Sequence, residues 1–492
     1  MFGPRSFALL KEILKDSWLE FKQKAEQTLS LSLSDSTIKE VERFIECGEP
    51  ACGFVRIKCS SCTHEHLVPF SCKTRGFCPS CYSKRLLDTQ NKFDELALFE
   101  IPIRQWVFTL PVPIRKVVIA RKELLKSISG IVQEELINYI KNKAVEELSV
   151  NKEGVHAGTI VFIHRFGSSI NANPHLHIML PEGVYIKKST GRLKFYKVSS
   201  PAEKDISNIL ESIYNKCIIL LEKKKIIEPY IDSSGNNSHT LLEFCENGTA
   251  EEKLSFASAS YDIVTGPNSG KKLKFCGGWS SYSFIDPQEE VPIFVSPLCY
   301  SMQGFSLHAN VKVHNKEGVE RLLGYMARPP VCEERLKINT DGSIYYKFKT
   351  PWSNGTDGIL FESGVEFIEK LVSIIPPKYQ HNIKYYGCFA PASWVRKELK
   401  AQNNSKIESK RVKLGDKNSK WAEGIKRVFK RDLSVCPKCS ANMVIIAVCI
   451  SYETVQAILN YFKVPNKPPT FTPPRKKWRE MQTNLFTNTI NF

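Results

Sequence analysis

Residues 173–180 read Asn-Pro-His-Leu-His-Ile-Met-Leu and are the most informative segment of the chain. Histidine alternates with apolar residues, which predicts a β-strand, because successive side chains of a strand point to opposite faces of a sheet. His175 and His177 then lie side by side on one face, while Leu176 and Ile178 pack on the other. Two imidazoles on a rigid sheet can bind a divalent metal ion. The alternative interpretation is two partly exposed histidines on a half-buried strand.

A second apolar run, residues 158–164, precedes this strand and ends in His164. The segment between the two runs is rich in Gly, Ser and Asn, so the runs are predicted to form an antiparallel pair. That pairing brings His164 beside His175 and His177. Three protein ligands leave open positions on a metal ion for a substrate oxygen, as catalytic metal sites require.

A helix over residues 316–327 is predicted from apolar residues at helical spacing. Tyr325 lies at the flank of the buried stripe, where its phenol can face a neighbouring sheet. Pro329 and Pro330 end the helix, and Arg328 before them can hold a phosphate. By helical position alone, a tyrosine is more often a packing residue than a catalytic one.

The pairs Cys59–Cys62 and Cys78–Cys81 are two CxxC motifs at the spacing of a zinc ribbon. Two such turns present four thiolates, the complete tetrahedral shell of a structural zinc ion, so these four cysteines are predicted to hold one Zn²⁺. Lys73 and Arg75 lie between the pairs and are candidate DNA contacts. A solvated charged rim is the alternative for these cations.

Further cysteines and histidines lie near this zinc ribbon and can replace a ligand or build a second site, although a small buried apolar role is more common for such cysteines. They are Cys47, Cys52, Cys72, His64 and His66. Cys436 and Cys439 form a lone CxxC pair, which is a candidate second zinc site without a clear fourth ligand.

The remaining patterns describe a basic chain of several units. Its 492 residues are too many for one compact domain, and a net charge of +18 favours a polyanionic partner. No signal peptide and no membrane span are recognised, which predicts a cytoplasmic protein with no membrane partner. Strands are predicted at 104–110 and 305–313, and helices at 7–30, 116–148 and 203–227.

Three parts are expected along the chain. Residues 1–94 are predicted to form a helical lead-in and a zinc-ribbon DNA-binding domain. Residues 95–400 are predicted to form the main domain, with an irregular, Ser/Gly/Asn-rich insertion at about 231–292. Residues 401–492 are predicted to hold a basic linker, a small CxxC unit and a disordered tail.

Five segments, in the same order along the chain, resemble the HUH rolling-circle transposases of bacterial insertion sequences, specifically the IS-ninety-one-like group. The resemblance covers most of residues 47–463. The matching segments are 70–81, 164–167, 173–177, 325–330 and 421–439.

This resemblance implies an α+β fold: an HUH endonuclease domain of antiparallel sheet with flanking helices, preceded by a zinc ribbon and followed by a small basic region. It implies Mg²⁺ or Mn²⁺ held by His175 and His177, with His164 as third ligand where many relatives carry glutamine. It also implies Tyr325 as the nucleophile that forms a 5′-phosphotyrosine with single-stranded transposon-end DNA. Some relatives carry a second tyrosine where Pro329 stands, so a single-tyrosine enzyme is expected.

Arg165 and Arg328, which belong to the matching segments, join Lys73 and Arg75 as candidate DNA contacts. Three other functions are alternatives to transposition. A plasmid rolling-circle replication initiator shares the order of motifs but usually lacks the zinc ribbon, and in a conjugative relaxase the tyrosine normally precedes the histidines. A zinc-ribbon DNA-binding protein without catalytic activity is disfavoured by the intact histidines and Tyr325.

Overall fold

The computed structural model describes residues 8–231, 237–241, 248–277, 297–408 and 435–471. At its centre is a six-stranded sheet in the order β12-β13-β3-β6-β5-β17, in which every pairing is antiparallel. The long strand β6 lies inside this sheet, between β3 and β5. The strands are β12 (Cys299–Met302), β13 (Phe305–Val313), β3 (Ile103–Thr109), β6 (Ala172–Pro181), β5 (Ile160–Phe166) and β17 (Ile383–Tyr385).

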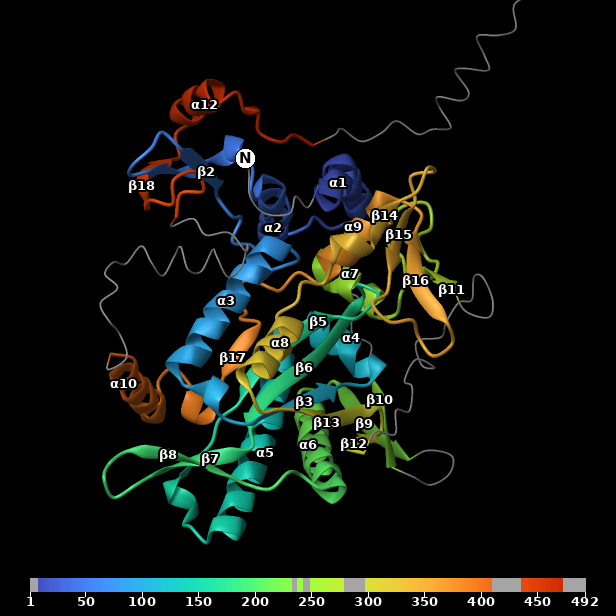
Figure 1. Cartoon of the computed structure of the whole chain (residues 1–492). Coiled ribbons are helices and arrows are strands. Elements are labelled where there is room, and N and C mark those ends of the chain that lie inside the picture. Colours follow the sequence, from blue (N-terminus) through green and yellow to red (C-terminus); the bar gives the residue numbers. More distant parts are fainter. Residues whose placement is uncertain (1–7, 232–236, 242–247, 278–296, 409–434, 472–492) are drawn as a thin grey trace, which may run out of the picture.

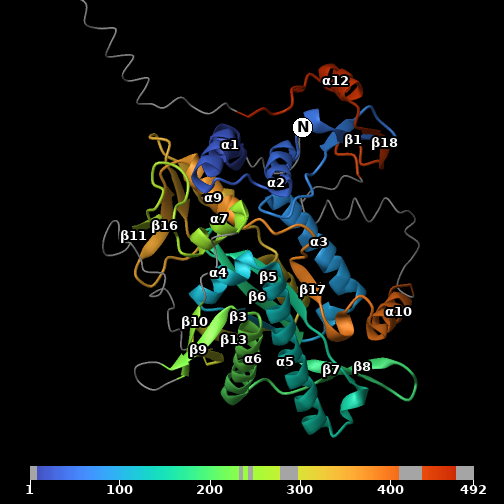
Figure 2. The ribbon, with the colours of Figure 1, turned by 180° about the vertical axis from the view of Figure 1, so that it is seen from behind.

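Helices cover both faces of the central sheet. Leu176 and Ile178 of β6 belong to an apolar core shared with α4 (Val112–Ala120), α5 (Lys122–Leu148) and α6 (Glu203–Lys223). Met179 faces the other side, in a core shared with α3 (Pro79–Glu95), α8 (Lys316–Met326) and α10 (Trp394–Glu408). Figure 1 shows α8 in front of β5 and β6, and Figure 2, from behind, shows α5 on the opposite face. The predicted α+β fold, an antiparallel sheet with flanking helices, is confirmed.

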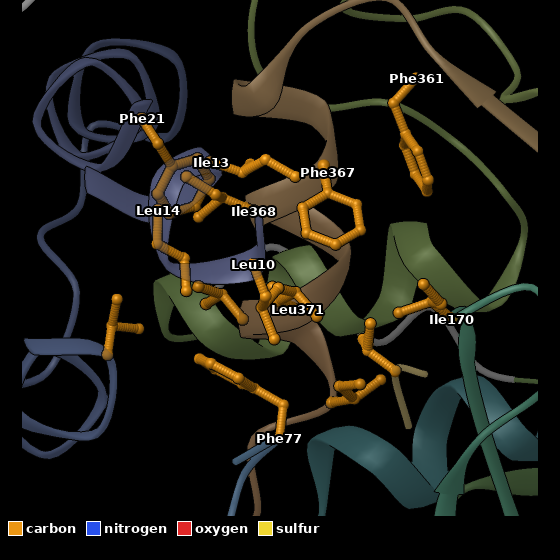
Figure 3. Close-up of a cluster of buried hydrophobic side chains, with 14 of the residues drawn as sticks. Leu10, Ile13, Leu14, Phe21, Phe77, Ile170, Phe361, Phe367, Ile368 and Leu371 are labelled. Carbon is orange, nitrogen blue, oxygen red and sulfur yellow. The ribbon is translucent and has the colours of Figure 1, made fainter. Parts of the chain in front are cut away.

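A second sheet, in the order β11-β16-β15-β14, packs with α1 (Ala8–Leu29), α2 (Asp35–Glu46), α7 (Ala250–Ala259) and α9 (Gly364–Ser373). Figure 3 shows Leu10, Ile13 and Leu14 of α1 against Ile368 and Leu371 of α9. The lead-in helix is therefore buried against segments more than 300 residues away in the sequence, as the Leu9 N–H bond to Glu333, 324 positions on, also illustrates. The strands are β11 (Lys274–Gly277), β14 (Leu336–Ile338), β15 (Ile344–Lys347) and β16 (Thr356–Phe361).

The prediction of an irregular insertion at 231–292 is wrong for much of its described part. Helix α7 and strand β11 fall inside it and contribute to the second core. Polar residues misled the prediction because they have structural roles: Thr249 and Glu252 form a capping box at the start of α7. Ser255 and Ser258 are buried and hydrogen-bonded, Ser255 to the carbonyl oxygen of Ser373.

Two other boundaries differ from the predictions. The helix expected over 116–148 is two helices, α4 and α5, separated at Arg121, which has extended backbone angles. Residues 401–408, expected as the start of the basic linker, belong to α10. The rest of that segment, 409–434, and the tail from 472 lie outside the described residues.

The smaller sheets lie at the periphery. One joins β18 (Met443–Cys449), β1 (Phe54–Cys59) and β2 (Glu65–Pro69), and α12 (Tyr452–Tyr461) packs beside it. Another joins β4 (Val155–His156), β7 (Gly183–Lys187) and β8 (Leu193–Lys197), and β9 (Ile227–Ile231) pairs with β10 (Asn237–Leu241). Among the helices that the structure describes, none combines the length and apolar character needed to span a membrane.

Candidate active site

Three histidines meet on the face of the central sheet that α8 covers. In the register of β5 with β6, His164 lies directly opposite His175. The ring centroids are 4.3 Å apart for His164 and His177, 5.0 Å for His175 and His177, and 5.1 Å for His164 and His175. One nitrogen from each ring lies within 4.8 Å of the other two. The predicted juxtaposition across the hairpin is confirmed.

One ring nitrogen of each histidine already has a hydrogen-bond partner. His164 Nε2 donates to the carbonyl oxygen of Met326 at 2.6 Å, and His175 Nδ1 donates to that of Asn173 at 2.8 Å. His177 Nδ1 lies 2.7 Å from the side-chain amide of Gln105, whose oxygen and nitrogen can exchange places without a change of shape. With the amide oxygen toward the ring, all three imidazoles donate to oxygen.

The other nitrogens are the candidate metal ligands. His164 Nδ1 and His177 Nε2 are buried and have no hydrogen-bond partner in the described structure. An imidazole that donates one N–H to an oxygen and keeps the other nitrogen unprotonated is the usual arrangement of a metal-ligating histidine. The donor set therefore fits a divalent ion. Of the two predicted ions, Mn²⁺ suits three imidazoles better, because Mg²⁺ prefers oxygen ligands.

Burial keeps these rings neutral. It lowers the pKa of His164 and of His177 well below the ordinary histidine value, and the neighbouring histidines lower both further. Burial also lowers the pKa of His175 to about 4. At neutral pH the cluster therefore carries free lone pairs, the form that binds metals.

Helix α8 brings Tyr325 to the histidine cluster. The side chain of Asn315 caps the helix by accepting a hydrogen bond from the Gly318 N–H. Val319 and Leu323 are buried on the inner face of the helix. Tyr325 is 39% exposed, and its ring centroid is 5.6 Å from that of His177. The His164 bond to Met326 also ties the end of this helix to the cluster.

A cavity of about 700 Å³ opens beside this arrangement. Its floor is formed by β6, β3 and β13, and α8 forms its roof. His175, His177, Tyr325, Gln105 and His308 are among the residues that line it. Tyr325, His175 and His177 thus border one cavity. Gln105 was not predicted as a site residue: it lies on the predicted strand 104–110, but the sequence does not show that this strand pairs with β6.

The cysteines form two clusters, and the predicted grouping of Cys59, Cys62, Cys78 and Cys81 is wrong. Cys78 and Cys81, at the start of α3, meet Cys47 at the end of α2 and Cys72. Cys59 and Cys62, at the end of β1, meet the distant pair Cys436 and Cys439. Spacing could not decide this, because the direction of β1 carries its cysteine pair away from α3.

Two family models match this chain. One, described as a putative transposase, matches residues 158–397, and the other, described as a transposase zinc-binding domain, matches residues 13–110. The first contains the three histidines and Tyr325, and the second contains Cys47 to Cys81. The chain belongs to the IS-ninety-one-like transposase family.

A curated relative agrees with this membership. It is the transposase for insertion sequence element IS801 of Pseudomonas savastanoi pv. phaseolicola, 26% identical over 153 residues. The alignment covers 31% of this chain and 34% of the relative, so the chain matches about a third of that relative's length. No solved structure matches the chain.

Structural zinc is consistent with this family and with the cysteine geometry. Four thiolates around zinc, with Zn–S bonds of about 2.3 Å, lie about 3.8 Å from one another. In the cluster of Cys47, Cys72, Cys78 and Cys81, the Sγ atoms are 3.6 Å apart for Cys47 and Cys78 and 3.3 Å for Cys72 and Cys81. All four Sγ atoms lie within 4.8 Å of one another, close enough for one ion to bind them together. Four protein ligands leave no open position for chemistry, so this zinc is structural.

We expect Cys78→Ser to remove one zinc ion per chain and to lower the unfolding temperature by roughly 5–10 °C, because metal binding is coupled to folding. Metal analysis and thermal unfolding measure the two effects. Cys217→Ser is the matched control, since Cys217 is also fully buried but belongs to neither cluster. Unchanged zinc content in Cys78→Ser would contradict the assignment.

The four cations predicted to contact DNA differ in their surroundings. Lys73 is exposed, and the Arg328 guanidinium lies 4.7 Å from the centroid of the Tyr325 ring. Arg75 donates to the carbonyl oxygen of Gln380 at 3.0 Å, and Arg165, 8% exposed, donates to its side-chain oxygen. Burial lowers the pKa of Arg165 to about 10. Arg75 and Arg165 thus already have partners within the protein, whereas Lys73 is exposed and Arg328 lies beside Tyr325.

Proposed function

We propose that this protein cleaves and rejoins single-stranded transposon-end DNA in rolling-circle transposition, with Tyr325 as the nucleophile. The observation that carries the proposal is the position of the Tyr325 ring, 5.6 Å from His177, over three histidines whose free nitrogens converge. Family membership favours transposition over plasmid replication initiation or DNA binding without catalysis.

His164, His175 and His177 would hold the catalytic Mg²⁺ or Mn²⁺ through His164 Nδ1 and the Nε2 atoms of the other two. When bound, the ion polarises a non-bridging oxygen of the scissile phosphate. Gln105 and the carbonyl oxygens of Asn173 and Met326 orient the three rings. The buried sheet surface keeps this geometry rigid.

The Tyr325 oxygen attacks phosphorus and loses its proton, while the bond from phosphorus to the 3′ oxygen breaks and that oxygen gains a proton. The products are a 5′-phosphotyrosine and a free 3′-hydroxyl. Because one phosphate ester replaces another, a second 3′-hydroxyl can reverse the step without ATP. Arg328, beside the phenol, balances negative charge on the phosphate.

The direct test incubates the full chain with end-labelled single-stranded oligonucleotides carrying transposon-end sequences and Mn²⁺. We expect a protein–DNA adduct that survives denaturation and is absent with chelator. A protein that binds these oligonucleotides but forms no adduct under any divalent ion would overturn the proposed chemistry.

His164 should tolerate glutamine better than alanine. The amide oxygen of His164→Gln can still ligate a hard ion, so we expect adduct formation within about tenfold of the wild type. His164→Ala should lose roughly 100-fold, because it removes a ligand and the bond to Met326 that holds the end of α8. Mn²⁺ titrations of adduct yield compare the two. Equal losses in both variants would count against His164 as a ligand.

A further inference from the structure

The second cysteine cluster draws its members from segments far apart in the sequence. Cys59 ends β1 and Cys62 follows it in a tight turn, whereas Cys436 and Cys439 precede β18. The Sγ atoms of Cys59 and Cys439, 380 residues apart, are 3.4 Å from each other. Those of Cys62 and Cys436 are 3.6 Å apart, and all four lie within 4.8 Å.

We propose that these four thiolates bind a second structural zinc ion, which joins residues 435–471 to the N-terminal zinc-binding domain. Neither family model extends to this part of the chain, because the matches end at residue 397. The sulfur separations agree with the distance of about 3.8 Å between ligands of one zinc ion. This site is independent of the catalytic proposal.

The turn around Cys59 and Cys62 has the backbone arrangement of a metal-binding knuckle. The N–H groups of Ser61 and Cys62 both donate to Cys59 Sγ at 3.4 Å. The His64 N–H donates to Cys62 Sγ at 3.5 Å. Donors aimed at sulfur stabilise the thiolate form, which is the form that ligates zinc.

The backbone of the two segments is already joined. Strand β18 pairs with β1 in antiparallel register from Phe54 opposite Cys449 to Cys59 opposite Met443. The Ser60 N–H donates to the carbonyl oxygen of Asn442 at 2.9 Å. Figures 1 and 2 both show red β18 beside the blue strands of the N-terminal domain. Residues 435–471 thus complete a sheet that begins at residue 54.

The apolar contacts of this unit are too few to hold it alone. The shared core consists of six buried residues, namely Ala51, Phe54, Leu67, Cys449, Val455 and Leu459. Outward residues of β18 stay exposed, with Val444 at 44% and Val448 at 62%. Units of fewer than about 40 residues usually need metals, disulfides or a partner to be stable. A zinc ion bound where β1 ends and β18 begins supplies the additional stabilisation that this unit needs.

The two clusters differ in accessibility, which predicts the order of metal loss. Each cluster has one half-buried cysteine, Cys72 in the first and Cys62 in the second, but the second cluster also contains Cys439, which is exposed. A chelator should therefore remove the second zinc first and release residues 435–471, while the first zinc stays bound.

The test measures zinc per full-length chain by native mass spectrometry. We expect two ions in the wild type. We expect one ion in each of two double variants, Cys59→Ser/Cys62→Ser and Cys436→Ser/Cys439→Ser. Replacing all four of these cysteines should still leave one ion, because both pairs serve the same site. Replacing Cys59, Cys62, Cys78 and Cys81 should leave none. Loss of two ions from the first quadruple variant, or retention of two in either pair, would overturn the proposal.

Matched controls are Cys52→Ser and Cys449→Ala, which lie in the same two segments but outside both clusters and should keep two ions. A second measurement needs no variant. As a chelator removes the second zinc from the wild type, alkylation and peptide mapping should label Cys59, Cys62, Cys436 and Cys439 together. Two results would contradict a zinc site. One is labelling of Cys436 and Cys439 while two zinc ions are still bound. The other is a disulfide from either of them to Cys59 or Cys62 in protein prepared with a reducing agent.

Discussion

Replacing Tyr325 by phenylalanine should abolish the covalent DNA adduct, with a loss of at least about a thousand-fold, because the substitution removes the only atom that can bond to phosphorus. The side chain is 39% exposed, and its hydroxyl does not support the core. Folding, metal content and affinity for single-stranded DNA should therefore stay near wild-type values. Adduct yield on a denaturing gel measures the effect.

Tyr345→Phe is the matched control. Tyr345 lies on β15, and its hydroxyl donates to Asp357 Oδ1 at 3.1 Å, away from the histidine cluster. Its loss should leave adduct formation unchanged. Peptide mapping of the wild-type adduct locates the phosphotyrosine directly. A phosphate on any residue other than Tyr325, or an adduct formed by Tyr325→Phe, would show that another nucleophile acts.

The double variant His175→Ala/His177→Ala should lose adduct formation by about a thousand-fold or more, since two of three proposed ligands disappear. Oligonucleotide binding should persist, because the net charge of +18 that favours DNA is unchanged. Burial keeps these rings neutral, so their removal deletes no buried charge. Adduct yield across a Mn²⁺ titration and anisotropy with labelled DNA separate the two properties.

His308→Ala provides the comparison within the same cavity. His308 lines the cavity but contributes no nitrogen to the cluster of three. The metal dependence of this variant should match the wild type even if its DNA preference changes. Full activity of the double variant would exclude a metal held by His175 and His177.

The sequence predicted the arrangement of the three histidines well because that arrangement is local. Alternation along residues 173–180 places His175 and His177 on one face, and a short hairpin brings His164 opposite His175. Helical spacing likewise predicts α8 and the flank position of Tyr325. What these patterns could not supply was Gln105, since its contact with His177 depends on which strand lies next to β6.

The cysteine grouping failed for a related reason. A CxxC turn presents two ligands, but its partner turn is chosen by tertiary structure, and the nearest pair in sequence was not the nearest in space. The polar segment 248–277 also misled prediction, because serine and threonine there serve as caps and buried hydrogen-bond donors. Composition shows that these residues are polar, but it does not show that they are buried and hydrogen-bonded in the folded protein.

The pairing of β1 with β18 determines when, during translation, this sheet can form. Cys59 and Cys439 are separated by 380 residues, and at about 5–20 residues per second a ribosome needs roughly 20–80 s to make that length. During this interval β1 has an unpaired edge, a surface prone to associate with other chains. Strand β18 can pair with β1 only after β5, β6 and α8, which carry the histidines and Tyr325, have been synthesised. A nascent chain therefore cannot complete this three-stranded sheet before His164, His175, His177 and Tyr325 have been synthesised.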